Sequence, residues 1–185
     1  MSEEIPGVTE EANGTPARAP RRLLEIPKDI QQQFAAHIAL YQTDPEKAHW
    51  WDARVVGAAG IVPTLMLTTL GRKSGEPRTT TLQYFRKGDK VILGATKGGT
   101  PRNPFWFENL VVNPQCDVRI GGFSGKAKAR VAQGDERAQL WDHISTIQPQ
   151  YQRYQARAER IIPVVVLDFY ESQGEMPDLQ NPPQA

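Results

Sequence analysis

Cysteine is nearly absent from this chain: Cys116 is the only one among 185 residues. A single thiol excludes an internal disulfide framework and any metal site built from several cysteines. It fits a reducing compartment, and the acidic first residues lack the apolar run of a secretory signal. We therefore predict a cytoplasmic protein.

An excess of charge of one sign and a long apolar run are missing as well. The chain has 22 Lys and Arg against 21 Asp and Glu, a net charge of +1. No global basic field then attracts nucleic acid, and an anion site has to be built locally. The longest uncharged apolar stretch, residues 55–70, is too short to span a bilayer and contains Gly57, Gly60 and Pro63. We predict no nucleic-acid partner and no stable membrane insertion.

Several catalytic signatures are missing too. His37, His49 and His143 lie in separate segments without metal-ligand spacing, so we expect no metal site. The glycines of residues 94–99 match P-loop spacing, but Thr100 stands where that loop needs a lysine. These absences exclude zinc hydrolysis and nucleoside triphosphate hydrolysis.

The sequence that is present predicts one α+β domain. Hydrophobic periodicity indicates helices over residues 27–41, 105–111, 135–147 and 149–160, and strands over 64–69, 79–85, 91–96, 118–121, 126–131 and 163–169. We expect Asn103 to cap the second helix. Six strands with inserted helices predict an antiparallel sheet that curls into a barrel over residues 23–172. The segments 1–22 and 173–185 have the composition of disordered tails.

The strongest candidate for a binding site is the turn at residues 71–78, GRKSGEPR. Three cations and a serine lie within a glycine-bounded turn, where backbone N–H groups and arginine can hold an oxyanion. The alternative is an ordinary hairpin turn with solvated charges. Lys97, Gly98 and Gly99 end a strand that we expect beside this hairpin, so Lys97 would reach the same anion. Phe105, Trp106 and Tyr84 would then contact the rest of the ligand.

Tyr151 and Tyr154 are three residues apart on one helix and therefore share a face. They either present their hydroxyls to a substrate or pack in the core with one edge exposed to solvent, and the sequence favours neither alternative.

The order and spacing of GRKSG (71–75), KGG (97–99) and NPFW (103–106), with residues 149–169, resemble the deazaflavin-dependent nitroreductase family. The resemblance covers residues 62–169. It implies an FMN-binding, pyridoxamine-phosphate-oxidase-like split β-barrel and reduced coenzyme F-420 as the cofactor. Such enzymes pass a hydride to nitro compounds, quinones or activated C=C bonds.

The resemblance also assigns residues to the cofactor. The phosphate and acidic tail would be held by Arg72, Lys73, Ser74, Gly75, Arg78, Lys97 and Gly98. The deazaflavin ring would be lined by Thr81, Gly94, Ala95, Thr96, Phe105 and Trp106. Thr81 stands where nitroreductase members are expected to have proline.

The predicted substrate pocket contains Gln83, Gln148, Tyr151 and Tyr154, the two glutamines replacing tyrosines of the nitroimidazole-reducing branch. This more polar pocket favours an enone or a quinone, with Tyr151 or Tyr154 polarising its carbonyl. Three alternatives stay open: an FMN-dependent oxidoreductase, a non-catalytic F-420 carrier, and a protein that contacts a membrane through the helix over residues 27–41. Both a homodimer and a monomer are compatible with the composition.

Overall fold

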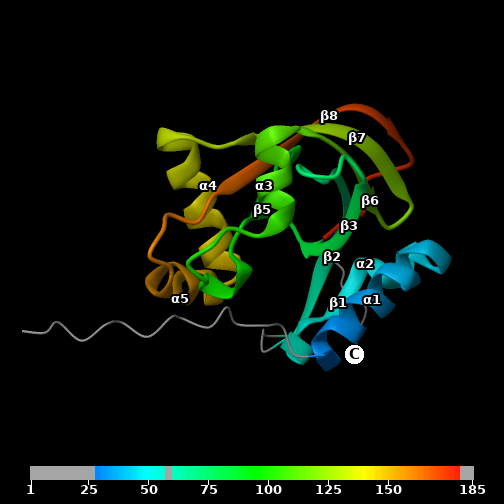
Figure 1. Ribbon diagram of the computed structural model, residues 1–185, viewed down its shortest axis with the longest axis horizontal. Coiled ribbons are helices and arrows are strands. Elements are labelled where there is room, and N and C mark those ends of the chain that lie inside the picture. Colours follow the sequence, from blue (N-terminus) through cyan, green and yellow to red (C-terminus); the bar gives the residue numbers. More distant parts are fainter. Residues whose placement is uncertain (1–27, 57–59, 180–185) are drawn as a thin grey trace, which may run out of the picture.

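The computed structural model describes residues 28–56 and 60–179, which form a curled antiparallel sheet with helices packed around it (Figure 1). The strands are β1 (Trp50–Asp52), β2 (Ile61–Leu70), β3 (Pro77–Gln83), β4 (Phe85–Lys87), β5 (Lys90–Gly94), β6 (Gln115–Ile120), β7 (Phe123–Val131) and β8 (Val164–Gln173). The helices are α1 (Lys28–Thr43), α2 (Pro45–His49), α3 (Phe105–Val112), α4 (Gly134–Ile147) and α5 (Gln150–Arg157), with short 3-10 helices η1 (Ala53–Val56) and η2 (Lys97–Gly99).

The sheet curls because β3 and β4, which are nearly continuous in the chain, pair with β2 and β5 at opposite ends of the strand order. β2 pairs with β3 and with β6, and the order continues through β7, β8, β5 and β4, with every pair antiparallel. Only Tyr84 separates β3 from β4. The strand predicted over residues 79–85 is therefore present but breaks at Tyr84, where the chain leaves β2 and pairs with β5. With β1, this break gives eight strands in the described chain where six were predicted.

Alternation along the strands divides the buried residues between two cores. Val91 and Leu93 belong to the main core inside the curl, whereas Ile92 packs with Phe85 and α4 on the outer face. β8 begins with four successive buried residues, which divide in the same way. A strand buried on both faces reads as a continuous apolar run, as the sequence does there.

Helices α1 and α2 pack against one end of the sheet through buried polar contacts. The ring of His37 stacks on Trp51 with 5.3 Å between centroids, and its Nε2 lies 2.8 Å from the carbonyl oxygen of Ala48. His49 Nε2 lies 2.9 Å from the Tyr84 hydroxyl. Burial lowers the pKa of both histidines. Helix α1 therefore packs on the barrel, the arrangement that its sequence favours over a membrane surface.

The structure confirms the predicted α+β class and the curled antiparallel sheet with inserted helices. β8 extends to Gln173, and Met176 and Leu179 then pack against the main core. The folded part thus continues beyond residue 172, where composition placed the start of a tail. The tail predicted over residues 1–22 and the last six residues lie outside the described chain. Within the described ranges, no helix is both long and apolar enough to cross a membrane.

Candidate functional site

The turn between β2 and β3 carries the first predicted motif on a loop that bonds to itself. The Gly71 amide donates to the carbonyl of Glu76 at 2.8 Å, and the Gly75 amide donates to the carbonyl of Gly71 at 2.7 Å. Gly75 has a φ of 70°, and a Cβ added to Gly71 would lie 2.7 Å from Ser74 Oγ. That oxygen accepts a hydrogen bond from Arg78 Nη2 at 3.4 Å. The glycines thus fix a compact turn whose cations are exposed.

Helix α3 anchors Arg72, the first cation of this turn. Arg72 Nη2 lies 2.5 Å from Glu108 Oε2, and the Arg72 amide donates to Asn109 Oδ1 at 3.1 Å. Asn109 is buried and its Nδ2 donates to Thr69 Oγ1 at 3.0 Å. The backbone and the guanidinium of Arg72 are therefore both positioned by α3, whereas the neighbouring Lys73 is exposed.

The turn after β5 has a rare backbone conformation. Lys97, Gly98 and Gly99 have φ angles of 46°, 63° and 76°, and Lys97 is the only non-glycine residue with positive φ in the described chain. Thr96 before them is right-handed. A right-handed residue followed by a left-handed one directs successive N–H groups to one side, which suits an anion. A Cβ on Gly99 would lie 2.6 Å from the carbonyl oxygen of Tyr154, so this position requires glycine.

Phe105, the first residue of α3, brings the two turns together. Phe105 is 67% exposed, and Lys97 Nζ and Arg72 Cζ lie 4.9 Å and 5.6 Å from the centroid of its ring. Both cations are within cation–π range. The predicted convergence is therefore present, but its cause differs from the one expected. β5 pairs with β4 and β8 and not with β3, so α3 makes the link. We call Arg72, Lys97 and Phe105, with the two turns that carry them, the clamp.

Two buried side-chain oxygens lack a hydrogen-bond partner among residues 28–56 and 60–179: Thr81 Oγ1 in β3 and Asn103 Oδ1 before α3. Asn103 does not cap α3 as expected, because the cap position is Pro104. Gln83 lies two residues after Thr81, hence on the same face of β3, and is half-buried. Buried polar atoms are normally paired, so a ligand that reached either oxygen would supply a hydrogen bond that the described chain leaves unmade.

Helix α5 places the two predicted tyrosines in different environments. Tyr151 is 6% exposed, its ring edge-on to Phe85 at 5.3 Å, and a Cβ on Gly94 would lie 2.5 Å from that ring. Tyr154 is half-buried, and its hydroxyl accepts a hydrogen bond from Gln150 Nε2. Burial raises the pKa of both phenols, so both are protonated at neutral pH. Tyr151 is mainly a packing residue, whereas Tyr154 keeps accessible surface.

Other predicted residues lie deeper than expected. Trp106 is edge-on to Phe107 in the main core, because adjacent helix residues differ by about 100° in direction and only Phe105 faces the clamp. Tyr84, expected as a ligand wall, is fully buried. Of the remaining residues predicted to contact cofactor or substrate, Ala95 and Gln148 are buried, and Gly94, Thr96 and Gly98 are partly exposed.

Three residues that contact the clamp are not marked by any motif in the sequence: Glu108, Asn109 and Arg160. Arg160 donates hydrogen bonds to the carbonyls of Ala95 and Thr96. The one signal for Asn109 in the sequence is that it is a polar residue within the largely apolar helix FWFENLVV. Nothing in the sequence near Arg160 marks its contact across more than 60 residues.

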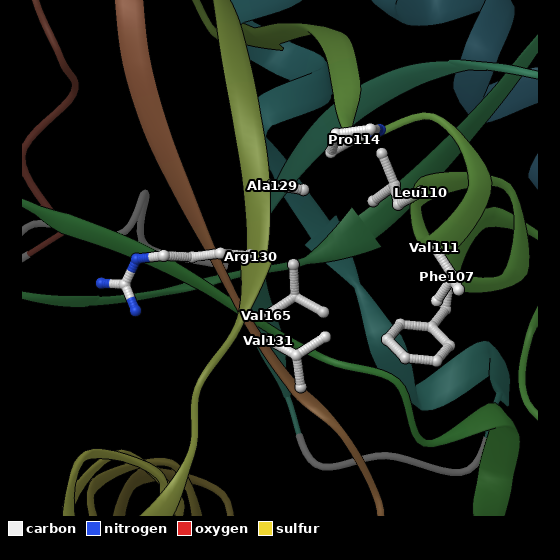
Figure 2. Close-up of a pocket in the computed structure, with 8 residues that line it drawn as sticks. All are labelled: Phe107, Leu110, Val111, Pro114, Ala129, Arg130, Val131 and Val165. Carbon is white, nitrogen blue, oxygen red and sulfur yellow. The ribbon is translucent and has the colours of Figure 1, made fainter.

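A separate apolar hollow of about 270 Å³ lies on the other side of α3 (Figure 2). Its lining consists of Phe107, Leu110, Val111, Pro114, Ala129, Arg130, Val131 and Val165. The guanidinium of Arg130 points away from the other labelled side chains and pairs with Glu136 at 2.6 Å. A binding pocket needs a few polar groups to orient its ligand. The hollow lacks these, so the clamp is the better candidate for the functional site.

The curled antiparallel sheet with its inserted helices defines a split-barrel protein. The family described as F420H(2)-dependent quinone reductase matches residues 50–168, which is more than half of the chain. This chain belongs to that family.

Individual relatives agree with this assignment. An F420H(2)-dependent quinone reductase of Mycobacterium tuberculosis is 39% identical over 140 residues, covering 74% of this chain and 89% of that protein. A solved F420-H2 dependent reductase (FDR-A) is 34% identical with a TM-score of 0.53, covering 57% of this chain and 94% of the other. A second solved structure, described as a domain-swapped dimer, is 29% identical with a TM-score of 0.56 and covers 77% of this chain and 100% of the other.

Family membership confirms three predictions: the split-barrel resemblance, coenzyme F-420 as the cofactor, and an oxidoreductase activity. The FMN-dependent and carrier alternatives have no support from these matches. The nitroreductase resemblance is sharpened to the quinone reductase branch.

Proposed function

We propose that this protein reduces a quinone to the hydroquinone with reduced F-420, and that the clamp holds the cofactor's phosphate and acidic tail. The convergence of Arg72 and Lys97 on Phe105 carries the proposal. Charge-assisted hydrogen bonds contribute about 1.5–3 kcal/mol each, so four cations, Arg72, Lys73, Arg78 and Lys97, would give a gross of roughly 6–12 kcal/mol before ordering costs, which reaches the range of micromolar binding. Lys73 and Arg78 extend the cationic surface along the tail, and Ser74 adds a hydroxyl group.

The residues fit this cofactor in two further respects. The donor set is cationic and hydroxylic, which suits phosphate and carboxylate oxygens. The unpaired Thr81 Oγ1 and Asn103 Oδ1 provide buried positions that the polar edge of a ring would satisfy. Bound there, reduced F-420 supplies a hydride, and the chain's own residues bind, orient and donate protons.

Tyr154 is the proposed hydrogen-bond donor to the quinone carbonyl. Its hydroxyl accepts from Gln150, which leaves the phenolic hydrogen free for a substrate oxygen. Burial raises the Tyr154 pKa above its ordinary value, so the donor is protonated at neutral pH. A quinone that accepts a hydride needs one proton on oxygen, and a polarised carbonyl takes it more readily, from Tyr154 or solvent. Tyr151 forms the packed wall behind it, and Gln83 and Gln148 add polar surface.

The test follows oxidation of reduced F-420 by a naphthoquinone, a cyclic enone and a nitroaromatic compound. We expect the quinone to give the highest kcat/KM, with little pH dependence around neutral pH because the Tyr154 pKa is raised and the phenol stays protonated there. Tyr154→Phe should lower kcat/KM about tenfold, the cost of one hydrogen bond to a developing oxyanion. Tyr170→Phe, an exposed tyrosine on β8, is the control.

Two outcomes would contradict the proposal. Faster turnover of the enone would reassign the substrate class, and an unchanged kcat/KM in Tyr154→Phe would remove Tyr154 from the reaction. A homodimer, the state reported for one solved neighbour, stays a prediction for this chain.

A further inference from the structure

Arg160, between α5 and β8, is bonded to both sides of the turn that carries Lys97. Its Nη2 donates to the carbonyls of Ala95 and Thr96, each at 3.0 Å, and its Nε donates to the carbonyl of Thr100 at 3.2 Å. The accepting carbonyls lie before and after the turn, so one planar guanidinium spans it. Helix α5, which precedes Arg160, also lies beside η2 (Figure 1).

The backbone that these bonds enclose is in an unfavourable conformation. Lys97 has a φ of 46°, although its Cβ disfavours left-handed backbone. Such a residue persists only where its surroundings over-determine the conformation, and strain of this kind collects at ligand-binding sites. The two carbonyls before Lys97 and the one after it are the points at which Arg160 supplies that constraint.

The charge on Arg160 is not neutralised within the described ranges. Desolvation by burial is what lowers the pKa of this guanidinium, with no carboxylate contributing, and Nη1 is buried without a hydrogen-bond partner among the described residues. Arg160 is half-buried, and the hydrogen bonds that its guanidinium donates to the turn all go to backbone carbonyls and none to a carboxylate. An unneutralised cation behind the turn also adds to the positive potential that an arriving anion meets.

We propose that Arg160 is a positioning residue for cofactor binding. It fixes the backbone of the η2 turn so that the Lys97 ammonium faces the anionic part of the cofactor, without touching the cofactor itself. This inference rests on the proposed function, because it assigns Lys97 to the cofactor.

The first test needs no cofactor and follows amide hydrogen exchange in the turn. The Gly99 amide donates to the carbonyl of Thr96 at 2.9 Å, and the Thr100 amide donates to that of Lys97 at 3.3 Å. In Arg160→Met, which keeps the aliphatic stem but removes the donors, both amides should exchange about tenfold faster or more as local opening becomes easier. Arg153→Met removes an exposed cation from α5 and should leave both rates unchanged.

The second test measures F-420 affinity by fluorescence and separates KM from kcat. Arg160→Met should raise Kd and the KM for reduced F-420 about tenfold through misplacement of Lys97, with kcat at saturation within about twofold of wild type. For Arg160→Lys, Kd and KM should lie between those of wild type and Arg160→Met, about threefold above wild type, because an ammonium cannot span three carbonyls. If Arg160→Met does not fold, the same measurements of Kd and KM are made on Arg160→Lys.

Unchanged exchange and unchanged Kd would overturn the role of Arg160. A lower kcat with an unchanged KM would also overturn it, because that pattern indicates damage to the reaction geometry. A wild-type chain that binds no F-420 would instead overturn the proposed function, and the exchange measurement keeps these two failures apart.

Discussion

The two turns of the clamp present cations to the same ring but are held by different means. The turn at residues 71–76 closes on its own backbone, through hydrogen bonds from Gly71 and Gly75 over at most five positions. The turn at residues 97–99 depends on Arg160 and on the backbone of Tyr154, more than 50 residues away in the chain. The conformation of the first turn is determined mainly by its own residues, whereas that of the second turn depends on tertiary contacts. Their responses to substitution should therefore differ.

The largest effect is expected at Gly99. Gly99→Ala would place a Cβ in left-handed backbone and within 2.6 Å of a backbone carbonyl that cannot move aside. Backbone strain and overpacking together should lower the free energy of unfolding by about 3 kcal/mol. Urea denaturation measures this loss, and F-420 binding should weaken with it.

Gly75→Ala is the matched substitution in the other turn. Gly75 also has a positive φ, 70°, but an added Cβ would meet nothing within 4 Å. Only the left-handed backbone then opposes the change, at about 1 kcal/mol. Equal losses at Gly75 and Gly99 would show that the second turn is no more dependent on tertiary contacts than the first.

Asn109 holds the backbone of the first turn from a distance in the chain, and its loss should have an intermediate effect. Asn109→Ala leaves the Arg72 amide and Thr69 Oγ1 without their partner. We expect the free energy of unfolding to fall by about 2 kcal/mol, because buried polar groups lose their hydrogen bonds. Thermal denaturation with Asn113→Ala as the control, at the exposed end of α3, checks this. A loss no larger than that of the control would mean that the turn supports itself entirely.

The smallest effect is expected at Glu108, which pairs with Arg72 at 2.5 Å. An anionic ligand competes with this carboxylate for the guanidinium. Glu108→Gln should therefore lower the Kd for F-420 about threefold, in keeping with the modest energy of a partly exposed ion pair. The gain should shrink at high salt. Weaker binding would instead assign Glu108 to the orientation of Arg72.

These differences explain which parts of the molecule the sequence reveals. Periodicity predicts four of the five α-helices of the described chain and most strands, but not α2 (Pro45–His49), which is too short to show a period. It also does not reveal the break at Tyr84, because both halves of that strand have the same β-rich composition. The cation-rich turn was visible because its glycines act over a few residues. The roles of Asn109 and Arg160 and the burial of Trp106 are not visible in the sequence. Each depends on which helix face or which distant segment of the chain packs against the barrel. Long-range packing carries no local signal in a single sequence.

The central claim is that the two turns form one anion clamp for F-420. A fluorescence titration of wild type, Arg72→Met and Lys97→Met with oxidised F-420, run beside FMN at moderate salt, tests it most directly. Saturable F-420 binding, much weaker FMN binding and a rise in Kd of about tenfold in each variant are expected from the loss of one charge-assisted contact. Binding of FMN alone, or F-420 binding that neither substitution changes, would contradict the clamp.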